Sequence, residues 1–201
     1  MEVPNQCPHC TNDHCIRSVP LFASLEPDAV HALTDQMEHK SYQKGEILVR
    51  EGDTATGFTV IRQGSAKAYR TSADGREQIL YIFPANDYYG ARILFTEEKV
   101  PYTVEALEET HVCILSKAQF SLLLEKHSSI ALQIIEAMAN RMSRLETAMQ
   151  SMGGRNADLR IASLLLEFKE PYGRYNGSDL EITLPLSREG LANYLGLARE
   201  T

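Results

Sequence analysis

The sequence contains no apolar run long enough to cross a bilayer, which takes about 20 residues. One of its longest apolar stretches, Ile161–Leu166, is short and is interrupted by Ser163. The N-terminus has no basic stretch followed by an apolar segment, so nothing marks the chain for secretion. These absences predict a cytoplasmic protein, in a reducing compartment, that has no membrane partner.

Basic residues are fewer than acidic ones: 20 Lys and Arg stand against 27 Asp and Glu, a formal net charge of −7. A negative charge spread evenly over a protein disfavours nucleic-acid binding, so the local distribution of charge decides that question. The length of 201 residues and the 43% hydrophobic content are those of a globular chain with a real core. Disordered, collagen-like and small disulfide-rich classes are therefore excluded.

Motifs of the common enzyme classes are also missing. The chain has no phosphate-binding loop, dinucleotide-binding glycine motif, zinc-protease motif or nucleophile elbow. The Cys7-x-x-Cys10 motif suits redox chemistry, but it lacks the βαβ context of a thioredoxin-like oxidoreductase. We therefore expect a protein that is not an enzyme.

Short β-rich runs separated by glycines occupy about residues 41–115. The runs are Ile47–Val49, Phe58–Ile61, Ala66–Tyr69 and Ile79–Phe83. Their spacing predicts an antiparallel barrel or sandwich. Asp74-Gly75 predicts a hairpin turn, because this pair tolerates the positive φ that such turns require. Ahead of this region, Pro27 after Glu26 predicts the start of a short helix.

A long helix is predicted from Lys117 to the Gly153-Gly154 pair. Its apolar residues recur at alternating steps of three and four, which is the spacing of a heptad seam. They are Ile135, Met138, Met142, Leu145, Met149 and Met152. Charged residues flank this narrow seam, which favours a coiled-coil dimer contact over a helix that faces only its own core.

Three more elements precede the last helix. They are a helix over Asn156–Lys169, a turn-rich loop over Pro171–Asp179 and a short strand over Leu180–Leu184. One apolar face is predicted for the helix, made by Leu159, Ala162, Leu165 and Leu166.

Residues Leu186–Thr201 have the form of a helix-turn-helix. Ser187 is predicted to cap the first helix of the pair. Ala192 is small where two helices approach, and Gly196 supplies the turn. The residues expected to hold the two helices together are Leu191, Leu195 and Leu197.

Taken in this order, the elements resemble the CRP/FNR family of regulators, and the Lys44–Asp53 and Val60–Gly64 stretches match turns of its β-roll. The resemblance implies an α+β fold: an N-terminal antiparallel β-roll similar to cyclic-nucleotide-binding domains, a long dimerisation helix and an incomplete C-terminal winged helix-turn-helix. The implied divisions are a Cys-rich segment at 1–18, a β-roll sensor domain at 19–116, the dimerisation helix at 117–153 and a partial DNA-binding domain at 154–201.

The resemblance also implies a transcriptional regulator that binds a two-fold-symmetric DNA duplex as a homodimer and acts with RNA polymerase. The implied DNA-binding residues are Ser187, Arg199, Glu200 and Thr201. The carboxylate of Glu200 suits a base contact because it accepts a hydrogen bond from cytosine N4. The sequence stops where the recognition helix opens, and residues 155–201 carry six basic and seven acidic side chains. We therefore expect a truncated regulator that binds DNA weakly.

In this family a Gly-Glu pair and an Arg-Ser pair hold a cyclic nucleotide, and the present sequence departs from both. Ala91 stands in place of the ribose-binding Glu, and Val100–Thr103 contain no phosphate-binding Arg. Burying a phosphate without a cation is costly. We therefore expect no cyclic nucleotide, and we expect the displaced Arg92 on the surface.

Three of the four cysteines, Cys7, Cys10 and Cys15, crowd into nine residues, and Cys113 stands alone. Four thiolates are the ligand set of a [4Fe–4S] cluster. The arrangement resembles the FNR branch of the family, which implies that these cysteines hold an oxygen-labile cluster and that the chain senses oxygen or redox state. The gap between Cys10 and Cys15 is one residue shorter than in the best-known members, which leaves the cluster type open.

Two other uses of the cysteines fit the sequence. Three cysteines with His9 or His14 suit a zinc site, and Cys7 with Cys10 suits a dithiol–disulfide switch. For Cys113 taken alone, a buried core cysteine is the simpler interpretation. Its position relative to the other three cysteines favours a ligand.

Overall fold

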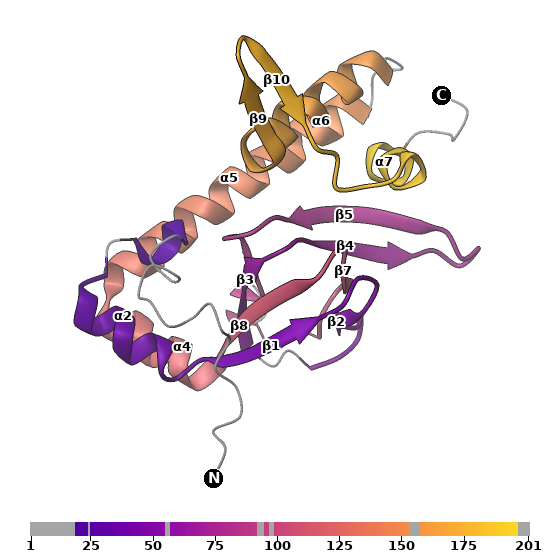
Figure 1. Cartoon of the computed structure of the whole chain (residues 1–201). Helices are drawn as coiled ribbons and strands as arrows, with labels where there is room; N and C mark the ends of the chain where they lie inside the picture. The colour runs from indigo at the N-terminus through magenta and orange to yellow at the C-terminus, as the bar shows by residue number, and fades with distance from the viewer. Residues whose placement is uncertain are drawn as a thin grey trace. The chain divides into compact units, whose positions relative to one another are not determined.

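The computed structural model describes residues 19–23, 25–54, 57–91, 95–96, 99–152 and 157–196 (Figure 1). Contacts divide the chain into two compact units. The first takes in Met1–Ala68 and Ile82–Glu136, and the second takes in Tyr69–Tyr81 and Ala137–Thr201. Within the described ranges, no helix combines the length and the apolar character that a membrane span needs.

Two four-stranded sheets form the β-roll, with strand orders β1-β8-β3-β6 and β2-β7-β4-β5. The strands are β1 Glu38–Tyr42, β2 Ile47–Val49, β3 Gly57–Gln63, β4 Ala66–Thr71, β5 Glu77–Phe83, β6 Tyr88–Tyr89, β7 Thr103–Ala106 and β8 Thr110–Ser116. Strand β8 is antiparallel to both of its neighbours, β1 and β3. The predicted antiparallel β-roll is confirmed.

The turn between β4 and β5 forms at the predicted Asp74-Gly75 pair. The amide of Gly75 donates to the carbonyl of Ser72 at 2.9 Å, and the amide of Ser72 donates to the carbonyl of Arg76 at 2.9 Å. Gly75 has a φ of +80°, a conformation that glycine adopts without steric cost. The local turn chemistry therefore sets the register of this hairpin.

Short helices accompany the first sheet. They are the 3₁₀ helix η1 Pro20–Phe22, α2 Pro27–Thr34 and α4 Lys117–Lys126. Helix α2 begins at the predicted Pro27. Helix α4 begins with a capping box, in which the Ser116 hydroxyl accepts from the Gln119 amide and the Gln119 side chain accepts from the Ser116 amide. These helices bury Phe22, Val30 and Phe120.

The predicted helix from Lys117 to Gly153 is two helices in the structure. Helix α4 ends at Lys126, and α5 runs from Ser128 to Met152. Between them His127 leaves the helical region, with φ −131° and ψ 75°. Ser128 and Ser129 follow, and serine disfavours a helix interior because its hydroxyl competes for backbone hydrogen bonds. The prediction of one unbroken helix was wrong for this reason.

In the second unit, helix α6 Ala157–Tyr172 leads into a hairpin of β9 Gly173–Asn176 and β10 Asp179–Ile182. The predicted strand is β10, but the predicted loop over Pro171–Asp179 contains β9 and is therefore wrong. The strands pair Asp179 with Asn176, so Gly177 and Ser178 form the turn. The Gly177-Ser178 dipeptide is a two-residue hairpin signal that was not used in the prediction.

Helix α6 buries a different face from the predicted one. Leu164 and Phe168 are buried, whereas Leu159, Ala162, Leu165 and Leu166 are exposed. The Phe168 ring contacts the Tyr172 ring edge-on at a centroid distance of 5.3 Å. The face of α6 that packs is therefore the one that carries Leu164 and Phe168.

Helix α7 Arg188–Leu195 has the predicted ends. The Ser187 hydroxyl accepts a hydrogen bond from the Gly190 amide at 3.2 Å. Gly196 follows the helix with a φ of +61° and closes its C-terminus. The prediction of a Ser187 cap and a Gly196 turn is confirmed.

Candidate functional site

Cys113 is the predicted cluster ligand that falls within the described residues. It lies on β8 between β1 and β3, and only 2% of it is exposed. The strand registers place it opposite His39 on β1 and opposite Val60 on β3. Its sulfur lies 3.3 Å from Nδ1 of His39, within hydrogen-bonding distance for sulfur. The sulfur therefore has an imidazole across one strand pair and an apolar residue across the other.

The ring of His39 is half-buried. Burial lowers the pKa of His39 below its ordinary value of 6.5, because desolvation disfavours the charged imidazolium. An imidazole ring carries an N–H on at least one of its two nitrogens, so this ring is a potential donor to the sulfur. Sequence reasoning missed His39, because 74 residues separate it from Cys113 and only the β1–β8 register joins them.

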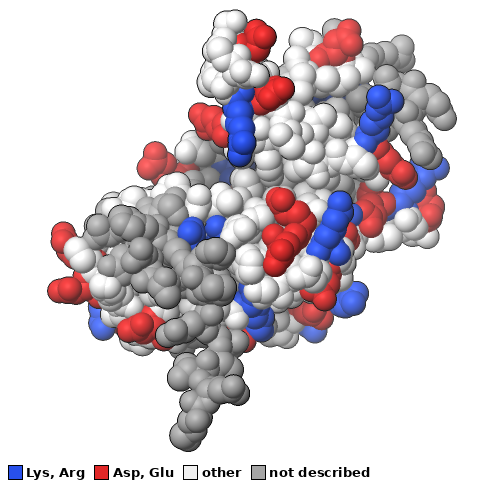
Figure 2. Space-filling view, viewed as in Figure 1, with Lys and Arg blue, Asp and Glu red and all other residues white. Residues whose placement is uncertain are grey.

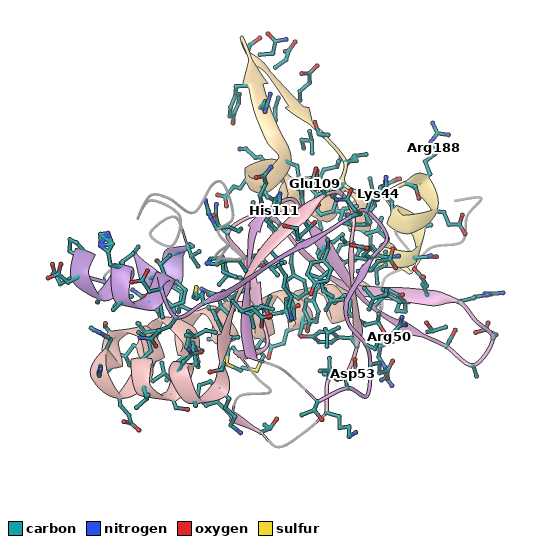
Figure 3. All side chains as sticks on the ribbon, turned by 60° about the horizontal axis from the view of Figure 1, so that its bottom comes forward. Lys44, Arg50, Asp53, Glu109, His111 and Arg188 are labelled. Atoms are coloured by element: carbon teal, nitrogen blue, oxygen red, sulfur yellow. The ribbon has the colours of Figure 1, made fainter. Side chains whose placement is uncertain are left out.

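A second histidine, His111, lies two residues before Cys113 on β8. Its Nδ1 is hydrogen-bonded to the Ser41 hydroxyl of β1 at 2.7 Å, and its Nε2 lies 3.7 Å from Oε1 of Glu109. Figure 3 shows Glu109 and His111 near each other at the start of β8. The β1–β8 pair thus holds both histidines in polar contacts across the strands.

The first described residues of the chain pack on the sheet face that carries Cys113. Cys113 and Leu115 are two residues apart on β8 and so point to one face, and Phe58 lies opposite Leu115. The Phe22 ring contacts the Phe58 ring edge-on at 6.0 Å, and Val19 is fully buried. The described chain therefore begins beside the strand that holds the candidate ligand.

The other candidate ligands, Cys7, Cys10 and Cys15, lie outside the described residues, as do His9 and His14. Among the residues that the structure does describe, no three or more His, Cys, Asp or Glu side chains gather as a metal site. The ligand set deduced from the sequence therefore stays a prediction, with the position of Cys113 known.

Apolar and aromatic side chains occupy the described positions at which relatives are expected to hold a nucleotide. Ala91 and Val100 are buried. Tyr89 is buried beside Phe83, with a ring distance of 5.6 Å, and burial raises the pKa of Tyr89 above its ordinary value. In the described part of 88–103, Lys99 is the one cation and it is exposed. Arg92 lies outside the described residues.

Helix α5 carries the predicted seam on its exposed side. Ile135, Met138, Met142 and Leu145 are between 41% and 63% exposed, whereas Ile130 and Ile134 are buried. The side chains of Met149 and Met152 lie outside the described residues. Leu132, which the sequence reasoning did not include, is also exposed and lies next to the seam. The seam is therefore an apolar surface on the single chain.

Helices α6 and α7 are joined by polar and aromatic contacts. The Arg160 guanidinium donates to the Leu195 carbonyl at 3.0 Å, and the Tyr194 hydroxyl donates to Oε1 of Glu167 at 3.0 Å. The Tyr194 and Phe168 rings stack at 6.3 Å. These contacts were not predicted. Leu191 and Leu195 were predicted to hold α7 to the helix that follows Gly196, and both are half-buried. Leu197, the third residue of that prediction, lies outside the described residues, so the prediction stays untested.

Of the predicted DNA-binding residues, only Ser187 is described, as the cap of α7. Arg199, Glu200 and Thr201 lie outside the described residues. The neighbouring Arg188 extends from the first turn of α7 (Figure 3). Figure 2 shows basic and acidic side chains interspersed on the visible face, so the described residues there form no continuous basic patch.

Comparisons with known proteins give one consistent family. Residues 39–127 match the cyclic nucleotide-binding domain and residues 159–201 match the Crp-like helix-turn-helix domain. The chain is 30% identical to the probable transcriptional regulator flp of Lacticaseibacillus casei, over 93% of this chain and 83% of that protein. It is 29% identical to the transcriptional activator protein FnrA of Stutzerimonas stutzeri, over 96% of this chain and 79% of that protein.

A solved structure shows the same fold. FixK2 from Bradyrhizobium japonicum superposes with a TM-score of 0.70 at 24% identity, covering 82% of this chain and 79% of that chain. The β-roll, the long helix and the helix-turn-helix match in order, and the matching relatives are regulators rather than enzymes. The chain therefore belongs to the CRP/FNR family of transcriptional regulators.

Proposed function

We propose that this regulator senses oxygen or redox state through a [4Fe–4S] cluster held by Cys7, Cys10, Cys15 and Cys113. The main support is that Cys113 is buried on the sheet face against which the first described residues of the chain pack. When bound, such a cluster supplies an oxygen-labile redox centre. The relative FnrA, a transcriptional activator, supports a role in gene control.

The reach of the chain fits this ligand set. Cys15 precedes the buried Val19 by four residues, and an extended chain spans about 3.3–3.6 Å per residue, or about 14 Å in all. Cys113 lies two strand residues, about 7 Å, from the Leu115–Phe58 pair on which Phe22 packs. The covalent link therefore allows the N-terminal cysteines to approach the Cys113 sulfur.

The surroundings of Cys113 suit a thiolate ligand. The sulfur is shielded from water by its position in the middle of a sheet, which protects a soft-metal bond. The His39 ring beside it, with Nδ1 3.3 Å from the sulfur, can donate a hydrogen bond to a charged sulfur. These residues fit a thiolate-bound cluster, in which Cys113 is the ligand from the roll.

A cyclic nucleotide is not part of the proposal. A bound phosphate needs a cation or several hydrogen-bond donors, and buried Ala91 and Val100 supply neither from their side chains. The buried rings of Phe83 and Tyr89 also fill space inside the roll. The β-roll is therefore proposed as the scaffold for the cluster ligand.

The proposed partners are a second copy of the chain, double-stranded DNA and RNA polymerase. CRP/FNR regulators bind DNA, typically as dimers. The exposed apolar seam of α5 supports self-association. RNA polymerase is proposed because the relative FnrA is a transcriptional activator.

The test is to purify the whole chain without oxygen and measure its visible absorbance with its iron and sulfide content. We expect brown protein with about four iron and four sulfide per chain, which bleaches in air. Cys113→Ser should hold no cluster while its far-UV circular dichroism stays that of a folded roll. The matched control is Ala106→Ser, which also adds a hydroxyl at a buried strand position of the roll and should keep the colour.

Two results would contradict the cluster. Colourless protein with one equivalent of zinc after anaerobic reconstitution would identify a zinc site instead. Metal-free protein in which Cys7 and Cys10 alternate between thiol and disulfide, followed by thiol labelling, would identify a dithiol switch.

A further inference from the structure

The contact between His39 and Cys113 is fixed by the backbone. Five consecutive residue pairs join β1 to β8, from Glu38 with Ile114 to Tyr42 with Thr110, and His39 with Cys113 is the second of them. Residues directly opposite each other on antiparallel strands share one face. The 3.3 Å approach of Nδ1 to Sγ therefore follows from the strand register.

The two strands beside Cys113 offer different surroundings to its sulfur. Strand β3 contributes Val60, which is 2% exposed and has no polar side-chain atom. Strand β1 is the edge strand of this sheet, and it contributes His39, which is only half-buried. His39 thus brings a polar group to the sulfur from a strand at one edge of the sheet.

We infer that His39 is a positioning residue of the cluster, whose Nδ1–H donates a hydrogen bond to the Cys113 sulfur. This inference rests on the proposed function. A donor withdraws negative charge from a ligating sulfur, which stabilises the reduced, more negative state of the cluster and raises its reduction potential. The same bond fixes the rotamer of Cys113 toward its metal. Losing it should therefore lower the potential and hasten loss of the cluster in air.

A histidine also fills space and covers the sulfur, so the test has to separate the hydrogen bond from packing. Asn and Leu both branch at Cγ, and the amide nitrogen of Asn stands near the position of Nδ1 of His. His39→Asn therefore keeps a donor, whereas His39→Leu keeps the branching without one. The control is His111→Leu, which removes a histidine from the same strand pair about 7 Å from Cys113.

The experiment loads the whole chain and each variant anaerobically, and it records iron and sulfide content, the midpoint potential by redox titration followed by electron paramagnetic resonance, and the rate of absorbance loss on mixing with dissolved oxygen. We expect His39→Leu to have a lower midpoint potential and to lose its cluster about tenfold faster. His39→Asn should stay close to wild type, and His111→Leu should not change either reading.

Each outcome decides between the two proposals. Wild-type protein that holds no cluster overturns the proposed function and this inference with it. A cluster in wild type whose potential and lifetime are unchanged in His39→Leu overturns only the inference. Equal losses in His39→Leu and His39→Asn would show that His39 only fills space, and that result also overturns it. A cluster absent from His39→Leu but kept in His39→Asn supports the hydrogen bond.

Discussion

The rings of Phe58 and Phe120 stack with their centroids 4.6 Å apart and an interplanar angle of 12°. Phe58 belongs to β3 and Phe120 to α4, and the Phe22 ring of η1 meets Phe58 at 6.0 Å. One aromatic cluster therefore joins the element that follows the cysteine segment, the β-roll and the helix that leads into α5. A substitution of Phe58 should therefore affect the packing of all three elements.

Phe58→Ala should lower the free energy of unfolding by about 3–5 kcal/mol, because it removes a fully buried ring and leaves a cavity between η1, β3 and α4. Urea unfolding followed by circular dichroism measures this. The control is Phe95→Ala, whose ring is 57% exposed and meets Phe120 only edge-on at 6.5 Å. A similar decrease in the free energy of unfolding for the two variants would show that the Phe58 ring is not central to this core.

Ser187→Ala should destabilise α7 by about 0.5–2 kcal/mol, because it leaves the Gly190 amide without its cap. Hydrogen exchange of the α7 amides measures the change locally. Ser187→Asp should restore protection, since a carboxylate accepts the same bond. The control is Ser178→Ala, which removes the hydroxyl of an exposed serine in the β9–β10 turn and should leave the exchange of the α7 amides unchanged. Unchanged exchange in Ser187→Ala would contradict the cap.

Features set by neighbouring residues were predictable from the sequence. The Asp74-Gly75 turn and the Ser187 cap each depend on a few local atoms, and the exposed seam of α5 follows from helical periodicity. The face of α6 was not predictable in this way, because Phe168 packs on the ring of Tyr194 in α7, which is distant in the sequence, as well as on Tyr172. The break at His127 was not predicted, because the composition and the apolar pattern of this stretch do not mark it.

The same difference between local and non-local features applies to the candidate site. Cys113 could be singled out because it joins three clustered cysteines in an arrangement that resembles the FNR branch, but its partner His39 lies on a strand 74 residues earlier. Only the register of β1 on β8 brings the two together. Sequence periodicity predicts that a residue lies in a strand, but it does not predict which residue lies opposite across a non-local pair.

Tyr89 should make the stability of the roll depend on alkaline pH. Its folded-state pKa is raised above the ordinary 10.0 by burial, so the folded protein keeps the proton that the unfolded chain loses. Its stabilising contribution is present below pH 10 and falls above it, by about 1.4 kcal/mol per pH unit. At neutral pH, Tyr89→Phe should lower the free energy of unfolding by about 1 kcal/mol, because it removes the hydrogen bond with Thr59. Above pH 10, the free energy of unfolding of this variant should fall less steeply than that of the wild type. Tyr175→Phe, at an exposed tyrosine, should keep the wild-type slope.

The α5 seam should dimerise the chain before any cluster is bound. Its described members, Ile135, Met138, Met142 and Leu145, are apolar and exposed, and no charge interrupts the seam. Burying such side chains contributes about 1.5–3 kcal/mol each, before the entropy cost of association is subtracted. An unpaired charge in a seam is what would make a dimer marginal without its cofactor.

Methionines also pack softly and specify register poorly, so the helices can re-pack within a standing dimer. We therefore expect the cluster-free protein to be largely dimeric at micromolar concentration, with the cluster acting on helix orientation. Sedimentation equilibrium of the cluster-free chain measures this. Met142→Lys should give a monomer, because it places two charges face to face in the seam, whereas Asn140→Lys, on the opposite side of the same helix, should remain dimeric. A cluster-free wild-type chain that is monomeric and associates only on reconstitution would instead make association itself the switch.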